Sequence, residues 1–238
     1  MRPALVAVAH GTRDPAGPEV IEALLGNVRR RLPGVDVITA WVELVAPGVD
    51  EVMSAMSRPS VVVPLLLSTG HHVKTDVPAS ADLSGAPVHV AAPLGPDRLL
   101  ARAMAARLRQ AGAQWGDAVV LAAAGSTDPA GLDDVERAAW LLSAEWGPRV
   151  THACVSASGP DLPEAVEHLR QSGADRVCVA PYLLAPGRFS RRVADLAAAA
   201  GATTVAPVLG SHQLLTDLVV HRYEQGVRAL AAARHIAA

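Results

Sequence analysis

Three loops in the first half of the sequence carry side chains that can bind a metal ion or accept a proton. His10 follows one short aliphatic run, Glu43 closes a second, and the pair His71 and His72 follows a third. Two imidazoles and a carboxylate suit a borderline divalent ion such as Fe²⁺, Co²⁺, Ni²⁺ or Zn²⁺. The same groups suit proton transfer near neutral pH. Adjacent side chains of an extended chain point in opposite directions, so at most one of His71 and His72 is expected to face a site.

The elements that must position these loops are short aliphatic runs separated by amphipathic stretches. The runs span residues 4–9, 35–42, 60–67, 86–93, 118–124, 150–157, 175–184 and 202–208. Continuous apolar runs between helical patterns predict parallel sheets covered by helices on both faces. Ligands of such sheets bind beyond the carboxyl ends of the strands. We therefore expect the three loops to meet at one sheet edge.

The sequence repeats itself. "HGTRDPAG" at 10–17 aligns with "AGSTDPAG" at 124–131, an offset of 124 − 10 = 114. "VPLLLSTGHHV" at 63–73 aligns with "APYLLAPGRFS" at 180–190, an offset of 180 − 63 = 117. The repeat predicts an α/β protein of two similar three-layer α/β/α domains with parallel sheets, residues 1–113 and 114–238. We expect a ligand in a cleft between the two lobes.

The second repeat serves as an internal control for the first. His10, Glu43 and His72 correspond to residues that cannot ligate a metal in the same way, namely Ala124, Ser156 and Phe189. The glycines and prolines of the turns persist in both copies. The pattern predicts a single site built by the N-terminal repeat, with the C-terminal repeat as the other wall.

Composition excludes several classes of function. The net charge is −2, no block of basic residues occurs, and Trp 4, Tyr 2 and Phe 1 give only seven aromatic residues, which argues against nucleic-acid binding. No apolar run approaches the roughly 20 residues that span a bilayer. The sequence also lacks GxGxxG, GxxxxGK[ST] and GxSxG motifs. The N-terminal apolar stretch is too short for a signal peptide, and Cys154 and Cys178 are typical of small buried residues, so we expect a cytoplasmic protein.

Each candidate residue also has a plainer interpretation. A histidine after a strand can be an ordinary loop residue, and Glu43 can be a solvated carboxylate. Asp76 precedes Val77 and Pro78 and is typical of a helix N-cap with proline in the first turn. Only the expected convergence of the three loops favours a functional site over these alternatives.

Three segments together resemble a known family. "VAVAHGTRDP", "VELVAPGVDEVM" and "VVVPLLLSTGHHVKTDVPA" resemble the sirohydrochlorin chelatases of the CbiX/SirB family, the class II chelatases, and the likeness spans nearly the whole chain. The resemblance implies a lyase of porphyrin biosynthesis that inserts a divalent metal into the tetrapyrrole sirohydrochlorin. Fe²⁺ would serve sirohaem biosynthesis and Co²⁺ cobalamin biosynthesis. The metal would be a substrate, and no organic cofactor is expected.

The resemblance also implies roles for individual residues. The family's catalytic and metal-binding residues match His10, Glu43 and His72, because Gly70 sets the frame of the last motif and leaves His71 at a variable position. These groups would hold the metal and accept the two pyrrole protons. Sirohydrochlorin carries eight carboxylates, so cations are expected to bind its rim. The candidates in the matching loops are Arg13, Lys74, Arg188 and Arg191.

Two other functions use the same residues. One is a non-catalytic carrier of a metal or tetrapyrrole, and the other is a metal-dependent hydrolase in which His10 and His72 hold a metal-activated water. Ligand chemistry does not choose among Fe²⁺, Co²⁺ and Ni²⁺. A compact chain without a histidine-rich or cysteine-rich tail favours iron and the sirohaem pathway slightly. Because the duplication supplies two lobes, both a monomer and a homodimer fit the sequence.

Overall fold

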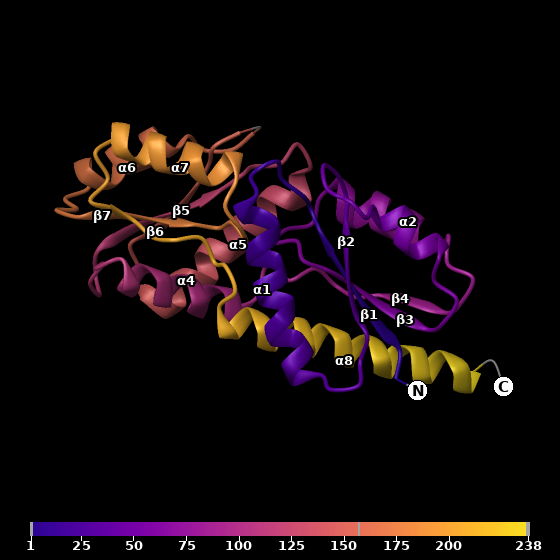
Figure 1. Ribbon diagram of the computed structural model, residues 1–238. Coiled ribbons are helices and arrows are strands. Elements are labelled where there is room, and N and C mark those ends of the chain that lie inside the picture. The colour runs from indigo at the N-terminus through magenta and orange to yellow at the C-terminus, as the bar shows by residue number, and fades with distance from the viewer. Residues whose placement is uncertain (1, 157, 237–238) are drawn as a thin grey trace.

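Two α/β lobes lie side by side in the protein, each with a parallel sheet between helices (Figure 1). The computed structural model describes residues 2–156 and 158–236. The first sheet has the strand order β2-β1-β3-β4, formed by β1 (Ala4–Ala9), β2 (Val37–Trp41), β3 (Ser60–Pro64) and β4 (Val88–Val90). The second has the order β6-β5-β7-β8, formed by β5 (Ala118–Ala123), β6 (Val150–Cys154), β7 (Val177–Pro181) and β8 (Thr204–Val205).

Helices follow the strands in both halves. They are α1 (Ala16–Arg31), α2 (Val49–Ser54), the π-helical turn η1 (His72–Asp76), α3 (Val77–Ala81), α4 (Arg98–Gln110), α5 (Pro129–Trp146), α6 (Leu162–Gln171), α7 (Arg188–Ala199) and α8 (Gln213–Ile236). Among the described residues, every helix is too short or too polar to cross a membrane.

The central strands are buried on both faces, which explains why the sequence shows continuous apolar runs. Every residue of β1 is buried. Leu5 and Ala7 face a core that runs between the two lobes, whereas Val6 and Val8 face an outer core under α2 and α3. A parallel strand covered by helices on both sides has no solvated face that would select polar residues. The expected fold, a duplicated α/β/α architecture, is thereby confirmed.

The last helix of each half packs against the other half. Helix α4 contacts α5 and β7 of the second lobe, whereas α8 contacts α1, β3 and β4 of the first. Figure 1 shows α8 running alongside the first sheet, far in sequence from its strands. The division at residues 113 and 114 remains a prediction for the sequence repeats, and the packing of these two helices crosses it. An amphipathic pattern states that a helix has a buried face but not which sheet covers it.

The two repeats have the same backbone conformation at the turns that follow their first strands. Gly11 has φ = 102° and Gly125 has φ = 101°, a conformation that favours glycine. A Cβ atom would lie 1.8 Å from the carbonyl oxygen of Glu43 at Gly11 and 1.9 Å from that of Ser156 at Gly125. Glu43 and Ser156 therefore hold equivalent places, as the alignment of the repeats predicted.

Candidate functional site

The candidate site lies beyond the carboxyl ends of three neighbouring strands. Strand β1 is flanked by β2 and β3, so the chain reverses its direction of winding there, and such a point is the usual ligand site of an open parallel sheet. His10 follows β1, Glu43 follows β2, and His72 follows β3. The backbone N–H of Glu43 donates to the carbonyl oxygen of His10 at 3.0 Å, which ties two of the loops together.

The structure brings His10, Glu43 and His72 together. One ligand atom from each lies within 4.8 Å of the other two. Nδ1 of His10 is 3.3 Å from Oε1 of Glu43, and the rings of His10 and His72 stand nearly perpendicular, with centroids 4.8 Å apart. The side chains are 46%, 47% and 33% exposed in chain order, so an ion can reach them from solvent. Two nitrogens and one oxygen suit Fe²⁺, Co²⁺, Ni²⁺ or Zn²⁺ and leave coordination positions open for a second ligand.

His71 lies outside this cluster. Its side chain is 74% exposed, and its Nε2 atom lies 3.5 Å from Oδ1 of Asp76. Its ring also stands 6.3 Å from that of His72, centroid to centroid. The cluster therefore contains His72, the histidine that the frame of Gly70 selected, while His71 lies at its edge.

The expected role of Asp76 as a helix cap is wrong. Helix α3 does begin directly after Asp76 with Pro78 in its first turn, but the carboxylate makes no capping hydrogen bond. Instead, Oδ2 of Asp76 lies 2.6 Å from Nδ1 of His72. The helical backbone already continues through η1 into α3: Val77 N–H donates to the carbonyl oxygen of His72, so the first N–H of α3 has a backbone partner.

The second lobe holds the loop that carries His72. The hydroxyl of Tyr182 donates to the carbonyl oxygen of Leu67 at 2.7 Å, and the N–H of Thr69 donates to Oδ2 of Asp134 at 2.6 Å. Tyr182 is buried, and burial raises the pKa of its hydroxyl. Sequence reasoning missed Tyr182 and Asp134, because these contacts join residues far apart in the chain and no local pattern marks them.

Two of the four candidate substrate cations pair with carboxylates of the opposite lobe. Nζ of Lys74 donates to Oδ2 of Asp128 at 2.6 Å, and Arg191 pairs with Asp14. The hydrogen bond from Lys74 holds the pKa of Asp128 below its usual range. The two ion pairs are equivalent under the duplication, since 128 − 14 = 114 and 191 − 74 = 117 are the offsets of the matching loops.

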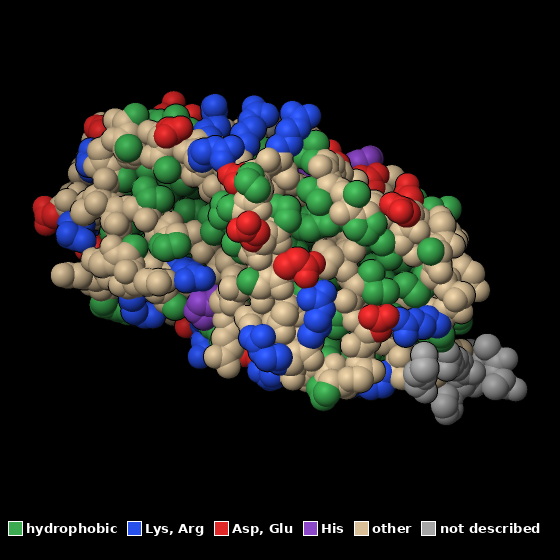
Figure 2. Space-filling view, in the orientation of Figure 1, with side chains coloured by type: hydrophobic (Ala, Val, Ile, Leu, Met, Phe, Trp, Pro, Cys, Tyr) green, Lys and Arg blue, Asp and Glu red, His purple; other side chains and the backbone are tan. Residues whose placement is uncertain are grey.

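The remaining two candidates, Arg13 and Arg188, are exposed. Arg188 begins α7, which also carries Arg191 and Arg192 in its first turns, and Figure 2 shows Lys and Arg side chains gathered near this helix. The cationic side chains thus lie at the end of the second lobe that faces the loops of the first.

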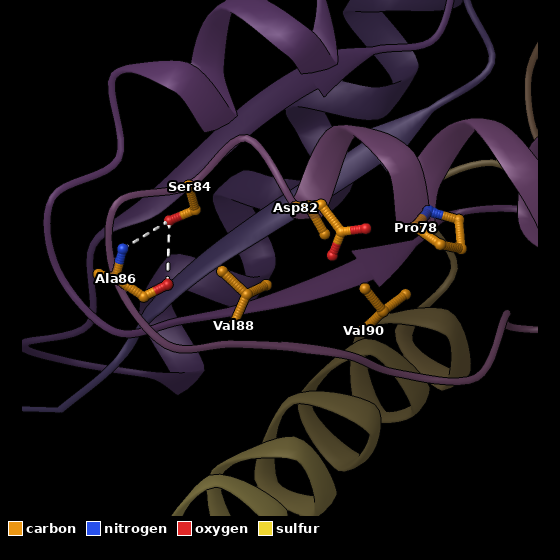
Figure 3. Close-up of a pocket in the computed structure, with 7 residues that line it drawn as sticks. Pro78, Asp82, Ser84, Ala86, Val88 and Val90 are labelled. Carbon is orange, nitrogen blue, oxygen red and sulfur yellow. Dashed lines mark hydrogen bonds between the residues drawn. The ribbon is translucent and has the colours of Figure 1, made fainter.

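A separate hollow of about 300 Å³ opens at the edge strand β4 (Figure 3). It is lined by Pro78, Ala81, Asp82, Ser84, Ala86, Val88 and Val90. The hydroxyl of Ser84 is hydrogen-bonded to the backbone of Ala86. Among these lining residues, Asp82 alone is ionisable. The hollow contains none of the residues predicted for the site, and its lining offers no set of converging polar groups.

With this fold and this cluster, the chain belongs to the CbiX family. The family's model matches residues 4–111 and again residues 118–226, once for each repeat.

Relatives with a named activity cover most of the chain. The sirohydrochlorin ferrochelatase of Priestia megaterium is 25% identical over 235 residues, which is 92% of this chain and 88% of the relative. The sirohydrochlorin cobaltochelatase of the same organism is 24% identical over 205 residues, covering 79% of this chain and 66% of the relative. Among solved structures, SirB from Bacillus subtilis with Fe3+ is 26% identical, with a TM-score of 0.78 over 99% of this chain and 98% of SirB.

Proposed function

We propose that this protein is a sirohydrochlorin chelatase, which inserts a divalent metal ion into sirohydrochlorin with release of two protons. The observation that carries the proposal is the convergence of His10, Glu43 and His72 at one sheet edge. Membership of the CbiX family and the names of the relatives support the tetrapyrrole as substrate. The metal is the second substrate, and the reaction uses no organic cofactor.

The orientation of the two imidazoles assigns their atoms. Nδ1 of His10 faces Glu43 and Nδ1 of His72 faces Asp76, so both Nε2 atoms remain for the incoming metal ion. Glu43 supplies either a third ligand or a base, because a carboxylate has two oxygens. Two pyrrole N–H groups lose their protons to the imidazoles and the carboxylate. At the same time, the ring nitrogens replace the protein ligands around the metal.

The basic residues of the loops bind the carboxylates of the substrate in this proposal. Arg13 and Arg188 are exposed and can do so directly. Lys74 and Arg191 would exchange their partners Asp128 and Asp14 for carboxylates of the tetrapyrrole. Both lobes come from one chain, so a monomer suffices. The two buried, free cysteines fit a reducing compartment, and we propose the cytoplasm as the location.

The test is metal insertion followed in the visible spectrum under anaerobic conditions. Sirohydrochlorin is mixed with Fe²⁺, Co²⁺ or Ni²⁺, with and without the purified protein, and the rates for the three ions identify the preferred metal. A chelatase accelerates insertion above the protein-free rate for at least one ion. A carrier binds the pigment without accelerating metal entry, and a hydrolase does neither; either outcome would refute the proposal.

A further inference from the structure

We infer that Asp76 is a positioning residue that orients the imidazole of His72, and that one extra residue in η1 creates this pair. The inference rests on the proposed function, in which His72 binds the metal ion. It assigns to Asp76 a task that differs from helix capping and from contact with either substrate.

The contact itself defines which atom of His72 is free. Oδ2 of Asp76 lies 2.6 Å from Nδ1 of His72. A carboxylate accepts hydrogen bonds, so Nδ1–H of His72 is the donor and the proton is held at Nδ1. The lone pair is then at Nε2, the atom that can bind the ion beside His10. Such a carboxylate–histidine pair fixes both the tautomer and the ring orientation of a metal ligand.

The backbone of Asp76 is itself held in place. The hydroxyl of Ser80 contacts the carbonyl oxygen of Asp76 at 2.8 Å and Oδ1 of Asp50 at 2.5 Å. Ser80 is buried, and Val77, directly after Asp76, belongs to the outer core of the first lobe. The carboxylate therefore projects from an anchored point of the chain toward His72.

The second repeat shows the same loop without the pair. The N–H of Lys74 donates to the carbonyl oxygen of Gly70 at 3.0 Å, and the N–H of Arg191 donates to that of Gly187 at 3.2 Å, so the loops match to this point. The next buried anchors are Val77 and Val193, each in the outer core of its lobe.

The distance along the chain to these anchors differs by one residue. Val77 follows Lys74 by 77 − 74 = 3 positions, whereas Val193 follows Arg191 by 193 − 191 = 2. The first repeat accommodates the extra residue as η1, in which Val77 N–H bonds to His72 five positions earlier, a π-helical pattern. The second repeat continues as regular α-helix α7.

The extra residue changes the spacing between the histidine position and the residue that precedes the buried anchor. One residue corresponds to about 100° of rotation around a helix. In the second repeat the residue before the anchor is Arg192, and its Nε donates to the carbonyl oxygen of Val155, in the loop after β6. In the first repeat the residue before the anchor is Asp76, and it bonds to His72 instead. The extra residue thus moves the side chain before the anchor from three positions after the histidine site (192 − 189 = 3) to four (76 − 72 = 4), the spacing at which Asp76 meets the imidazole.

The first experiment compares Asp76→Ala, Asp76→Asn and a control, Asp82→Ala. Asp82 is exposed, ends the same helix and lies in the hollow beside Val90 (Figure 3). Co²⁺ binding is titrated from its visible absorption, and the tautomer of His72 is identified by long-range ¹H–¹⁵N NMR of the metal-free protein.

Asp76→Ala is expected to weaken Co²⁺ binding about 10- to 100-fold and to move the His72 proton away from Nδ1. Asp76→Asn retains an acceptor oxygen and should recover most of the affinity and the tautomer, while Asp82→Ala should match the unmodified protein. An unchanged tautomer and affinity in Asp76→Ala would overturn the inference and leave the chelatase proposal standing. Failure of the unmodified protein to bind Co²⁺ would instead count against the proposed metal site.

The second experiment deletes Thr75, an exposed residue of η1. The deletion gives the first repeat the loop length of the second, which folds as an α-helix. We expect a cooperative thermal transition and Co²⁺ binding at least about 10-fold weaker than in the unmodified protein. Binding within about threefold of the unmodified protein would refute a role for the extra residue. A deletion that abolishes folding would show that the extra residue is needed for the fold rather than for the pair, and would overturn this part of the inference.

Discussion

The loops that follow β3 and β7 are two versions of one turn. Both strands end at a buried proline, Pro64 or Pro181, and both loops pass through a glycine before a helix that returns to the outer core. Only the first version carries a histidine of the candidate metal site and an extra residue in its helix. The backbone framework is thus kept in both repeats, while a π-turn and a few side chains distinguish the loop that contributes to the candidate site.

The two lobes also hold each other's loops unequally. Reciprocal ion pairs, Lys74 with Asp128 and Arg191 with Asp14, join them in both directions. The buried hydrogen bond from Tyr182 to the loop of His72 has no such counterpart in sequence, because Leu65 occupies the equivalent position of the first repeat. The repeat that lacks the candidate metal site therefore supplies a hydrogen bond to the loop of the repeat that has it.

The largest expected effect separates the two adjacent histidines. His72→Ala should lower the rate of metal insertion at least about 100-fold, because it removes a ligand and proton acceptor of the cluster. His71→Ala should stay within about threefold of the unmodified protein, since His71 is mostly exposed and outside the cluster. Initial rates with sirohydrochlorin and the preferred metal test both. The reverse ranking would show that the frame set by Gly70 is wrong.

A smaller effect is expected from Tyr182→Phe, which sharpens the role of the second lobe. Loss of the hydroxyl leaves the carbonyl of Leu67 without this donor and should lower the free energy of unfolding by about 1–3 kcal/mol. The insertion rate should also fall, because the loop of His72 loses its anchor. Urea unfolding and insertion kinetics provide the measurements.

Tyr223→Phe is the matched control for Tyr182→Phe. The hydroxyl of Tyr223 donates to the carbonyl oxygen of Pro3 at 2.7 Å, at the opposite end of strand β1 from His10. Tyr223→Phe should lower the free energy of unfolding without changing the rate of metal insertion. Equal effects of both substitutions on the rate would mean that Tyr182 acts through general stability alone.

The ion pair of Lys74 predicts a weak dependence of stability on pH. Because Lys74 lowers the pKa of Asp128 in the folded protein, the pair stabilises above the unfolded carboxyl pKa of about 3.9, and the contribution disappears as pH falls through the lower folded value. Lys74→Met should therefore reduce stability at pH 7 and make no difference near pH 2. The effect should be small, as for other exposed pairs. Unfolding free energies measured across this range test the sign, and a loss confined to acidic pH would contradict it.

The smallest expected effect is that of grafting the chemistry onto the second repeat. Ala124→His, Ser156→Glu and Phe189→His together should leave the protein with one Co²⁺ site, because α7 lacks the π-turn and the positioning carboxylate. Isothermal titration reports the stoichiometry. Two equivalents bound would show that ligand identity alone makes a site, and the comparison of the two loops would lose its meaning.

Much of the fold could be predicted because burial leaves a direct record in the sequence. The runs 4–9 and 118–124 became β1 and β5 almost residue for residue, since both strands are covered on two faces. The run 60–67 overestimated β3, which ends at Pro64. Leu65 lies just beyond that end, yet it is buried in the core between the lobes and its N–H donates to the carbonyl oxygen of Val8 in β1. The apolar run therefore records burial rather than the end of the strand.

The grouping of the three candidate side chains was predicted from the sequence, but the contacts that support them were not. His10, Glu43 and His72 each follow a strand, and parallel strands bring their carboxyl ends to one edge, so the grouping follows from local patterns. The contact between Asp76 and His72 was not predicted, because Val77 and Pro78 favoured a capping role for Asp76. Spacing of four residues on one helix face was the signal that could have found it.

The sequence by itself determined the strands, the duplication and the grouping of His10, Glu43 and His72 without His71. Only the tertiary structure decided which sheet α4 and α8 cover and which carboxylates Lys74 and Arg191 meet. The physical reason is the same for both. Periodicity and residue type state that a group is buried or charged, whereas its partner depends on how distant segments close around a shared core.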